Sequence, residues 1–306
     1  MLISVVVSTR NRVNSLRRCV NALSEIKTRR EWEIVIVNNG STDGTADFLD
    51  SLPKQIAGAA VATAYETKRG LAAARNTGVV AAKGEILAFT DDDCYVTENY
   101  IDSVAAAFER QRDLSVIGGR IMPYDPTDLR LTINESEVYQ PIPPRSSIVC
   151  GDVQGANMAF RRSAIQKVGG FTEFLGPGTP FNCEDADATA RVIWAGMAGA
   201  YDPSIVVYHH HGRKTPADSK EIHRSYAFGR GAFFMKFILR RDSRWVYVKA
   251  WINAITGHLK YSFATLLRGR RPSLVAVREL QGGISYAIAQ RRLERNVDYL
   301  KRRRPN

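Results

Sequence analysis

The chain has few cysteines, and none of them lies in a pair spaced for a disulfide or a metal. Its four cysteines are scattered over 306 residues without a CxxC motif. A disulfide-stabilised scaffold is therefore not expected, and free thiols in a reducing compartment are the simplest interpretation. The sequence also lacks an uninterrupted run of about 18 apolar residues, which a membrane-spanning helix requires.

The apolar segment nearest to such a helix, residues 246–267, is interrupted by polar side chains at Lys249, Asn253, His258 and Lys260. We therefore do not expect it to span a bilayer. The N-terminus enters a strand-like run at once, without a basic region or a cleavage site. This favours a cytoplasmic protein without a secretory signal.

Acidic residues become scarce in the last third of the chain. Residues 213–306 contain 22 Lys+Arg and 6 Asp+Glu, whereas residues 1–212 contain 21 and 25, so the net charge of +12 comes from the tail. We predict a catalytic domain over residues 1–215 and a basic helical extension over 216–306. A tail of this charge favours an anionic partner, either nucleic acid or acidic lipid.

Strand and helix patterns alternate through the first hundred residues. Buried strands are predicted at 2–7, 32–37, 61–65 and 86–91, with helical segments between them. Such alternation predicts crossover units and an α/β fold with a mostly parallel sheet. Residues 125–144 are rich in proline and predict an irregular connection.

Three consecutive carboxylates, Asp91, Asp92 and Asp93, directly follow one of these strands. Like charges this close resist ionising together unless a cation lies among them. In an open α/β sheet, ligands bind at the carboxyl ends of the strands. The pattern indicates a metal-assisted phosphate site, although a solvated acidic turn would have the same sequence.

Three other polar clusters fall on predicted loops. Residues 9–12 suit a diphosphate cradle, because arginines and backbone N–H groups gather at a helix start. Residues 38–45 suit contact with a base edge or, alternatively, a helix cap. Residues 182–187 open a helix behind a glycine-rich loop, so one of their carboxylates is a candidate general base, although acids there also stabilise the helix dipole.

Seven ordered motifs carry a family resemblance. They are VVVSTRNR (5–12), VNNGSTDGT (37–45), RGLAAARNTG (69–78), GEILAFTDDD (84–93), GANM (155–158), VGGF (168–171) and EDAD (184–187). Over residues 2–212 the chain resembles the family 2 glycosyltransferases. The resemblance implies a GT-A fold (Rossmann-like), a nucleotide-diphospho-sugar donor, a divalent cation, Mg²⁺ or Mn²⁺, and inversion at the anomeric carbon.

The resemblance also implies roles for individual residues. Asp185 matches the catalytic base, and Asp93 matches the metal ligand of the Asp-x-Asp motif. Glu184 and Asp187 flank the base and are acceptor or lid candidates. His209 lies where several relatives place a histidine that completes the metal or diphosphate site, although it can also be a plain loop histidine. The predicted nucleotide-binding residues are Thr9, Asn11, Arg12, Asn39, Arg69, Arg75, Asp91 and Asp92.

Asn39 departs from the family pattern, because many members have an acidic residue there that accepts a hydrogen bond from the uracil N3–H. An amide oxygen still accepts that bond, but without charge assistance. A uridine or thymidine donor remains the preferred prediction.

The tail predicts an amphipathic helix from Trp245, with Val248, Ile252, Ile255, Leu259 and Leu266 at helical spacing and basic residues around them. This helix either packs on the catalytic domain or lies on an anionic leaflet. The terminal basic run at 301–304 adds to such attraction. Nucleic-acid binding fits the charge, but no recognition motif accompanies it.

The leading interpretation is an inverting, metal-dependent glycosyltransferase at the inner face of the cell membrane. It would transfer a sugar from a UDP-sugar to a glycan or lipid-linked acceptor in cell-surface polysaccharide synthesis. The alternatives are a nucleotidyltransferase of similar fold, which would be expected to have a glycine-rich loop and a lysine near the N-terminus, and a noncatalytic nucleic-acid binder.

Overall fold

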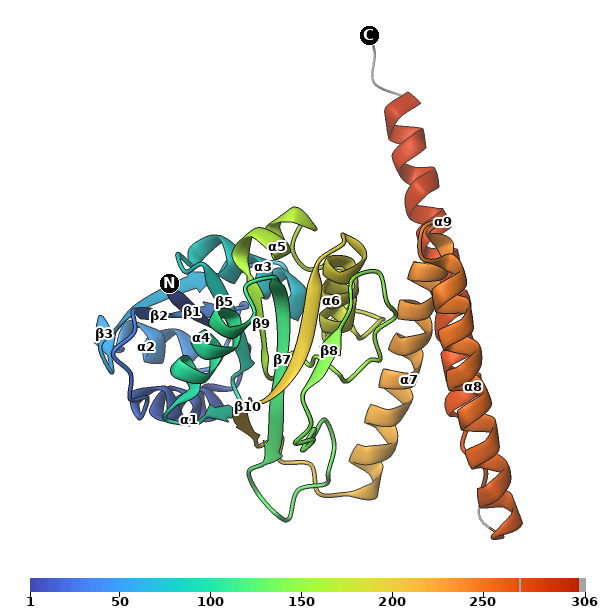
Figure 1. The fold of residues 1–306 in the computed structure, drawn as a ribbon, viewed down its shortest axis with the longest axis horizontal. Coiled ribbons are helices and arrows are strands. Elements are labelled where there is room, and N and C mark those ends of the chain that lie inside the picture. The colour runs from blue at the N-terminus through green and yellow to red at the C-terminus, as the bar shows by residue number, and fades with distance from the viewer. Residues whose placement is uncertain (270, 303–306) are drawn as a thin grey trace. The chain divides into compact units, whose positions relative to one another are not determined.

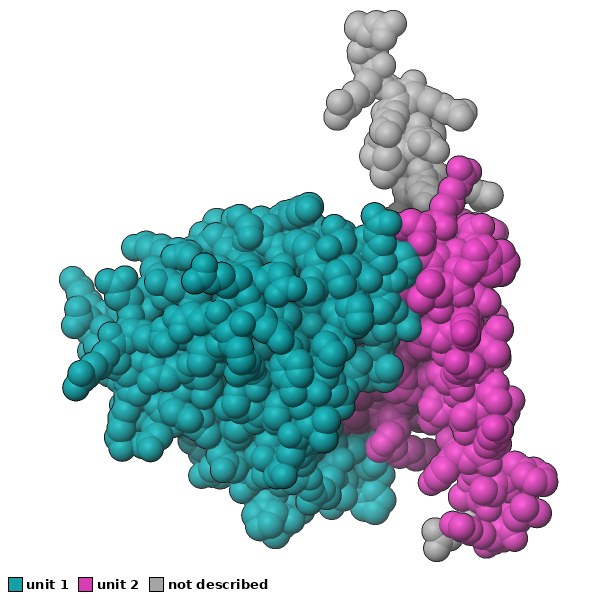
Figure 2. All heavy atoms as spheres, viewed as in Figure 1, with its two compact units in different colours: residues 1–179, 184–219 teal, residues 180–183, 220–306 magenta. Residues whose placement is uncertain are grey.

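The computed structural model describes residues 1–269 and 271–302, and the side chains of 1–269 and 271–292 (Figure 1). The chain divides into two compact units, coloured separately in Figure 2. Unit 1 comprises residues 1–179 and 184–219, and unit 2 comprises 180–183 and the chain from 220 onward. The boundary predicted near residue 215 lies close to the last of these divisions. Arg303 and Arg304 of the terminal basic run lie outside the described residues.

Unit 1 is built on a ten-stranded sheet with the strand order β3-β4-β2-β1-β5-β9-β7-β10-β6, and β8 pairs with β10. The strands are β1 (Ile3–Thr9), β2 (Trp32–Asn38), β3 (Gln55–Ile56), β4 (Ala59–Tyr65), β5 (Ile86–Asp91), β6 (Cys94–Val96), β7 (Leu114–Pro123), β8 (Gln140–Ile142), β9 (Met158–Arg161) and β10 (Ala198–His209).

β4, β2, β1 and β5 pair in parallel, as the alternating pattern predicts, and the two-residue β3 is antiparallel to β4 at the edge. The second half is mixed. β9 lies between β5 and β7 and is antiparallel to both, and β6 and β8 are antiparallel to β10. The alternating pattern of the first hundred residues does not reach β9, so its antiparallel insertion is seen only in the structure.

Helices cover both faces of this sheet (Figure 1). They are α1 (Val13–Ser24), α2 (Thr45–Asp50), α3 (Leu71–Ala81), α4 (Tyr100–Arg110), α5 (Arg162–Lys167) and α6 (Glu184–Trp194). The apolar face of α1, formed by Leu16, Cys19, Val20 and Leu23, is buried in one core with Val5 and Val7 and with α4. α3 packs on the opposite face, where a Cβ at Gly78 would overlap the side chain of Val6. Glycine is therefore required for this close approach.

The segment predicted to be irregular, 125–144, is mostly loop but contains β8 and a single bridge from Asn134 to Ile121 of β7. Its proline content limits the ladder hydrogen bonds it can donate. Two short anchors therefore fix this connection to the sheet.

Unit 2 consists of α7 (Pro216–Leu239, whose first four residues are assigned to unit 1), α8 (Arg244–Leu267) and α9 (Val275–Arg302). A Cβ at Gly231 would overlap the backbone of Glu279, and one at Gly282 would overlap the backbone of Phe228, so glycines let α7 and α9 approach closely. Aromatic rings fill the remaining core, including the stacked pair of Phe234 and Trp251. Among the described residues, none of the helices combines the length and apolarity needed to cross a membrane.

Candidate active site

The carboxyl ends of three parallel strands bring the predicted loops together. Thr9 of β1 lies opposite Asn38 of β2, and Ser8 lies opposite Asp91 of β5. The loops that follow these strands therefore share one edge of the sheet, which is where open α/β sheets bind ligands.

The acidic triplet is held by side chains from the loop after β1. Asp92 and Asp93 are buried, whereas Asp91 is partly exposed. The Thr9 hydroxyl donates to Asp92 at 2.7 Å. The Arg12 guanidinium bridges both buried acids, with N–O distances of 2.9 Å to Asp92 and 2.6 Å to Asp93. Thr9 and Arg12, both predicted to bind nucleotide, thus lie directly at the triplet.

The two buried carboxylates differ in their affinity for protons. Burial raises the pKa of Asp92 to about 7, against the opposing effect of Arg12. Burial acts the same way on Asp93, but hydrogen bonds from His209 and Arg12 hold its pKa well below the usual range. Asp93 is therefore the more firmly ionised of the two, as expected of a metal ligand.

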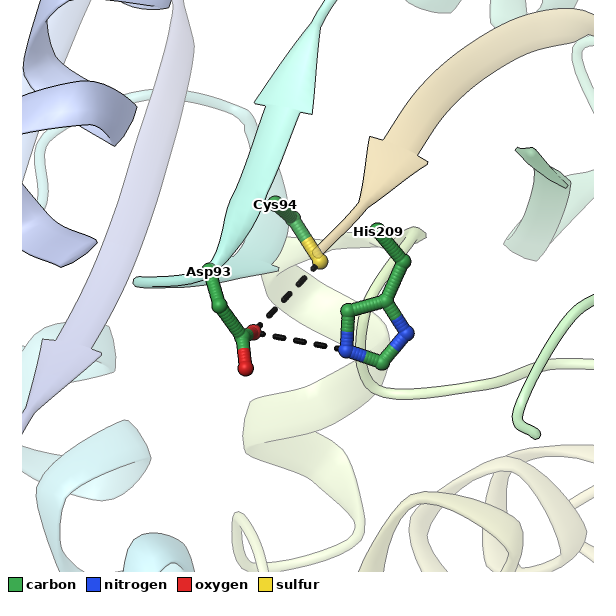
Figure 3. Close-up of side chains that lie close together, drawn as sticks. All are labelled: Asp93, Cys94 and His209. Atoms are coloured by element: carbon green, nitrogen blue, oxygen red, sulfur yellow. Dashed lines mark hydrogen bonds and ion pairs between the residues drawn. The ribbon is translucent and has the colours of Figure 1, made fainter. Parts of the chain in front are cut away.

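Asp93, Cys94 and His209 converge where β6 begins and β10 ends (Figure 3). One ligand atom from each lies within 4.8 Å of the others. His209 Nε2 is 3.4 Å from Asp93 Oδ1, and its Nδ1 is 3.0 Å from the Thr132 hydroxyl. Cys94 has no spacing signal in the sequence beyond its place directly after the triplet, so sequence reasoning missed it.

The donor set fits a divalent cation held by Asp93 and His209. Carboxylate oxygens suit Mg²⁺ and Mn²⁺, and an imidazole nitrogen suits transition metals. Burial raises the pKa of the Cys94 thiol well above its usual range. Mg²⁺ and Mn²⁺ also prefer oxygen ligands to the softer sulfur, so Cys94 is the weakest candidate ligand of the three. The Arg12 guanidinium on the same carboxylates is an independent sign that this position accepts positive charge.

Of the three adjacent histidines, the structure brings His209 to the triplet by its side chain. His210 lies 3.3 Å from Arg18 and 3.2 Å from the Tyr95 hydroxyl. His211 Nε2 lies 2.8 Å from the backbone oxygen of Leu129, and its Nδ1 accepts from the backbone N–H of Arg213. His210 thus contacts α1 and β6, and His211 contacts the loops at Leu129 and Arg213.

The predicted base lies at the start of α6, which begins at Glu184 as expected. Asp185 is partly exposed and accepts a hydrogen bond from the Gly155 N–H at 2.8 Å. Asp187 is fully buried and accepts from Thr172 and Arg191. Within the segment 184–187, Asp185 is thus the carboxylate that solvent reaches, because Glu184 is buried as well.

Arg75 connects this helix to the acidic triplet. Its side chain is only 2% exposed, and it donates to Glu184 at 2.7 Å and to Asp91 at 3.1 Å. A Cβ at Gly155 would overlap its guanidinium. Although we predicted Arg75 to bind nucleotide, the structure places both of its terminal nitrogens on carboxylates of the protein.

Glu184, the partner of Arg75, is itself unusual. Burial, together with the neighbouring Asp185 charge, raises the pKa of Glu184 to about 7, and Arg75 opposes the shift. Glu184 is therefore poised between its two protonation states near neutral pH.

The remaining predicted nucleotide-binding residues, Asn11, Asn39 and Arg69, lie on the loops that follow β1, β2 and β4. Asn39 is buried; its amide oxygen accepts from the Gly70 N–H, and its nitrogen donates to the backbone oxygens of Glu66 and Lys68. Asn11, at a φ of 53°, accepts from the Thr42 N–H. Arg69 is exposed. Asn39 and Asn11 thus organise the loops, whereas Arg69 is available to solvent.

Comparison with known protein families identifies the family of this chain. The family described as "Glycosyl transferase family 2" matches residues 4–169, which is more than half of the chain. The chain belongs to this family. The matched range holds the acidic triplet and Arg75, while Asp185 and His209 lie beyond it.

Individual proteins with similar sequences are also glycosyltransferases. The chain is 29% identical over 219 residues to a pre-mycofactocin glycosyltransferase of Mycobacterium tuberculosis, covering 68% of this chain and 43% of that protein. It is 30% identical over 169 residues to the putative glycosyltransferase EpsH of Bacillus subtilis, covering 54% and 48%. The chain thus spans about half the length of the curated relatives it matches.

Solved structures show the same GT-A fold. The mannosyltransferase PcManGT of Pyrobaculum calidifontis, solved with GDP-Man and Mn²⁺, has a TM-score of 0.63 at 16% identity, covering 93% of this chain and 86% of that one. S. aureus TarS 1–349, solved with UDP-GlcNAc, has a TM-score of 0.58 at 14% identity, covering 95% and 92%.

Proposed function

We propose that this family 2 member is an inverting, metal-dependent glycosyltransferase that uses a nucleotide-diphospho-sugar. The observation that carries the proposal is one connected arrangement. Arg75 joins the acidic triplet through Asp91 to the start of α6 through Glu184, next to Asp185. This connection fixes the position of the general base relative to the site for the leaving diphosphate. A one-step substitution at the anomeric carbon requires such a fixed arrangement.

In this mechanism Asp185 removes the proton from the acceptor hydroxyl while that oxygen attacks the anomeric carbon from the face opposite the diphosphate. Asp93 and His209 would hold a divalent cation, whose positive charge stabilises the departing diphosphate. The Gly155 N–H orients the carboxylate of Asp185. Because His209 contributes an imidazole, we favour Mn²⁺ over Mg²⁺.

A UDP-sugar is the donor that we favour. The amide of Asn39 occupies the position of the family's base-reading acid, and its oxygen has a second lone pair besides the one that accepts from Gly70. Since GDP-Man and UDP-GlcNAc both occur with solved GT-A relatives, the donor is a matter for direct assay. The proposed acceptor is a glycan or lipid-linked glycan of a surface polysaccharide.

The alternatives have less support. The loop after β1 contains arginines, not the glycine-rich turn and lysine expected of a nucleotidyltransferase. A noncatalytic nucleic-acid binder would leave the buried triplet and Asp185 without a role.

Hydrolysis of a panel of nucleotide sugars with Mn²⁺, Mg²⁺ or chelator tests this function. We expect slow, metal-dependent release of UDP that stops with chelator. Pyrophosphate release from a nucleoside triphosphate would instead support a nucleotidyltransferase.

The variant Asp185→Asn tests the base. It should lower transfer to an acceptor by about 10² to 10⁴ and leave UDP affinity nearly unchanged, because Asp185 faces the acceptor. Asp50→Asn, an exposed acid on α2, is the matched control and should transfer normally. Normal transfer by Asp185→Asn would overturn the assignment of the base.

A further inference from the structure

The helix α8 has two faces of different character. Tyr247 and Trp251 are buried in unit 2. Another set is exposed, with Trp245 at 77%, Ile252 at 59%, Leu259 at 58% and Leu266 at 56%. These four residues recur every seven positions, and because two helical turns take about 7.2 residues, they form one stripe along the helix.

The neighbouring helix α9 has an exposed apolar stripe as well, formed by Val277, Leu280, Ile284 and Ile288. α8 and α9 contact each other within unit 2, since Trp251 Nε1 donates to Glu279. The Ser262 hydroxyl of α8 also donates to the backbone oxygen of Ser273, just before α9. Large exposed apolar areas on monomeric proteins mark surfaces that bind another molecule or a membrane.

The charges around these stripes have one sign. Residues 243–292 contain a single acid, Glu279, and nine basic residues: Arg244, Lys249, Lys260, Arg268, Arg270, Arg271, Arg278, Arg291 and Arg292. Glu279 is fully buried and pairs with Arg230 and His258. The accessible charged groups of this segment are therefore basic.

We propose that α8 and α9 form a docking face for an anionic lipid surface. On such a surface the indole and aliphatic side chains enter the headgroup region, and lysines extend their charged ends toward lipid phosphates. Lys249 and Lys260 are both exposed, and at about 100° per residue they lie at one border of the α8 stripe. The face thus combines the two attractions that an interfacial helix uses, apolar burial and charge.

A second copy of the chain fits this face less well. The seven-residue spacing resembles a coiled-coil seam, but such seams are commonly flanked by pairs of opposite charge. Within 243–292 a second copy would offer basic groups to basic groups. An anionic leaflet offers the opposite charge.

Flotation of the full chain with vesicles of phosphatidylcholine alone, or mixed with phosphatidylserine, tests the proposal. We expect strong binding to the anionic vesicles at low salt and weak binding to the neutral ones. Binding should fall steeply toward about 1 M salt, where the Debye length is about 3 Å.

Two variants separate the contributions, and both change exposed positions, so unchanged circular dichroism and melting are expected. Lys249→Glu with Lys260→Glu should weaken binding at least about tenfold, since each basic group near the surface contributes about fivefold. Trp245→Ser with Ile252→Ser should weaken it similarly. Val80→Ser, on the exposed apolar position of α3, is the control and should bind normally.

Equal binding to neutral and anionic vesicles, or none at low salt, would overturn the proposal. Dimerisation abolished by Ile252→Ser would assign the face to a second copy, and salt-sensitive binding to RNA without vesicle binding would assign it to nucleic acid. The proposal rests on unit 2 alone, so its failure would leave nucleotide-sugar hydrolysis unaffected.

Discussion

Charged residues are arranged differently in the candidate active site of unit 1 and in the helices of unit 2. In unit 1 the buried acids Asp92, Asp93 and Glu184 each face a guanidinium of the protein, from Arg12 or Arg75. In residues 243–292 the single acid, Glu279, is buried and paired, while basic residues outnumber it nine to one. The buried acids of unit 1 are thus paired within the protein, whereas most basic groups of residues 243–292 have no acidic residue of that segment to pair with.

This difference separates two functions of charged residues. A buried, paired charge fixes geometry, because removing either partner leaves the other uncompensated. An exposed, unmatched charge contributes little to folding but attracts an external partner. Substitutions of the buried, paired charges in unit 1 should therefore alter stability and chemistry, and charge substitutions on α8 should alter binding.

The largest expected effect is at Asp93. Asp93→Ala should remove metal-stimulated binding of UDP and lower sugar transfer by more than about 10³-fold, because Asp93 is the proposed ligand of the cation that would neutralise the phosphates. Titration calorimetry with UDP, with and without Mn²⁺, measures it. An affinity that Mn²⁺ still raises in this variant would show that Asp93 is not the ligand.

The second-largest effect should come from removing the buried ion pairs of Arg75. Arg75→Ala leaves Glu184 buried without its partner and should lower the free energy of unfolding by about 3–5 kcal/mol. Denaturant titration measures it. Arg75→Lys keeps the positive charge but cannot donate to two carboxylates at once. Its free energy of unfolding should therefore lie between those of wild type and Arg75→Ala. An unchanged stability in Arg75→Ala would show that the pairs are not needed to hold α6.

A smaller effect should appear as pH dependence at Glu184. Its pKa is about 7 in the fold against 4.5 ordinarily, so the folded state keeps a proton that the unfolded state has released. Its contribution to stability therefore falls as pH rises from 4.5 to 7. Glu184→Gln should flatten the change in melting temperature over this range, relative to wild type. An identical pH profile in the variant would contradict the raised pKa.

The smallest effect should come from an exposed ion pair of unit 1. Lys27 lies 2.6 Å from Glu98, and both side chains are largely exposed. Lys27→Ala should not change the melting temperature measurably, because solvent screens such pairs. A shift as large as that of Arg75→Ala would remove the distinction between buried and exposed charge drawn above.

Much of this fold is readable from local pattern. The apolar positions of α1, the strand that ends on the triplet and the start of α6 follow from spacing and residue type. Each is a feature of a few consecutive residues, and side-chain periodicity reports such features directly.

What the sequence did not predict depends on partners distant along the chain. Arg75 pairs with a residue 109 positions away, and Cys94 meets His209 only because β6 and β10 run antiparallel. Likewise, helical spacing on α8 identifies an apolar stripe but not whether the stripe is buried. The structure shows it exposed at Trp245, Ile252, Leu259 and Leu266.

The bridge from Arg12 to Asp92 and Asp93 has a consequence for how a cation would enter. The chain already supplies an internal counterion, so the two acids can fold together without waiting for a metal. A divalent ion that enters must then displace the Arg12 guanidinium from these acids. The measured free energy of metal binding is therefore the difference between the interaction of the acids with the metal and their interaction with Arg12. Arg12→Gln should accordingly bind Mn²⁺ more tightly and become more dependent on it for stability.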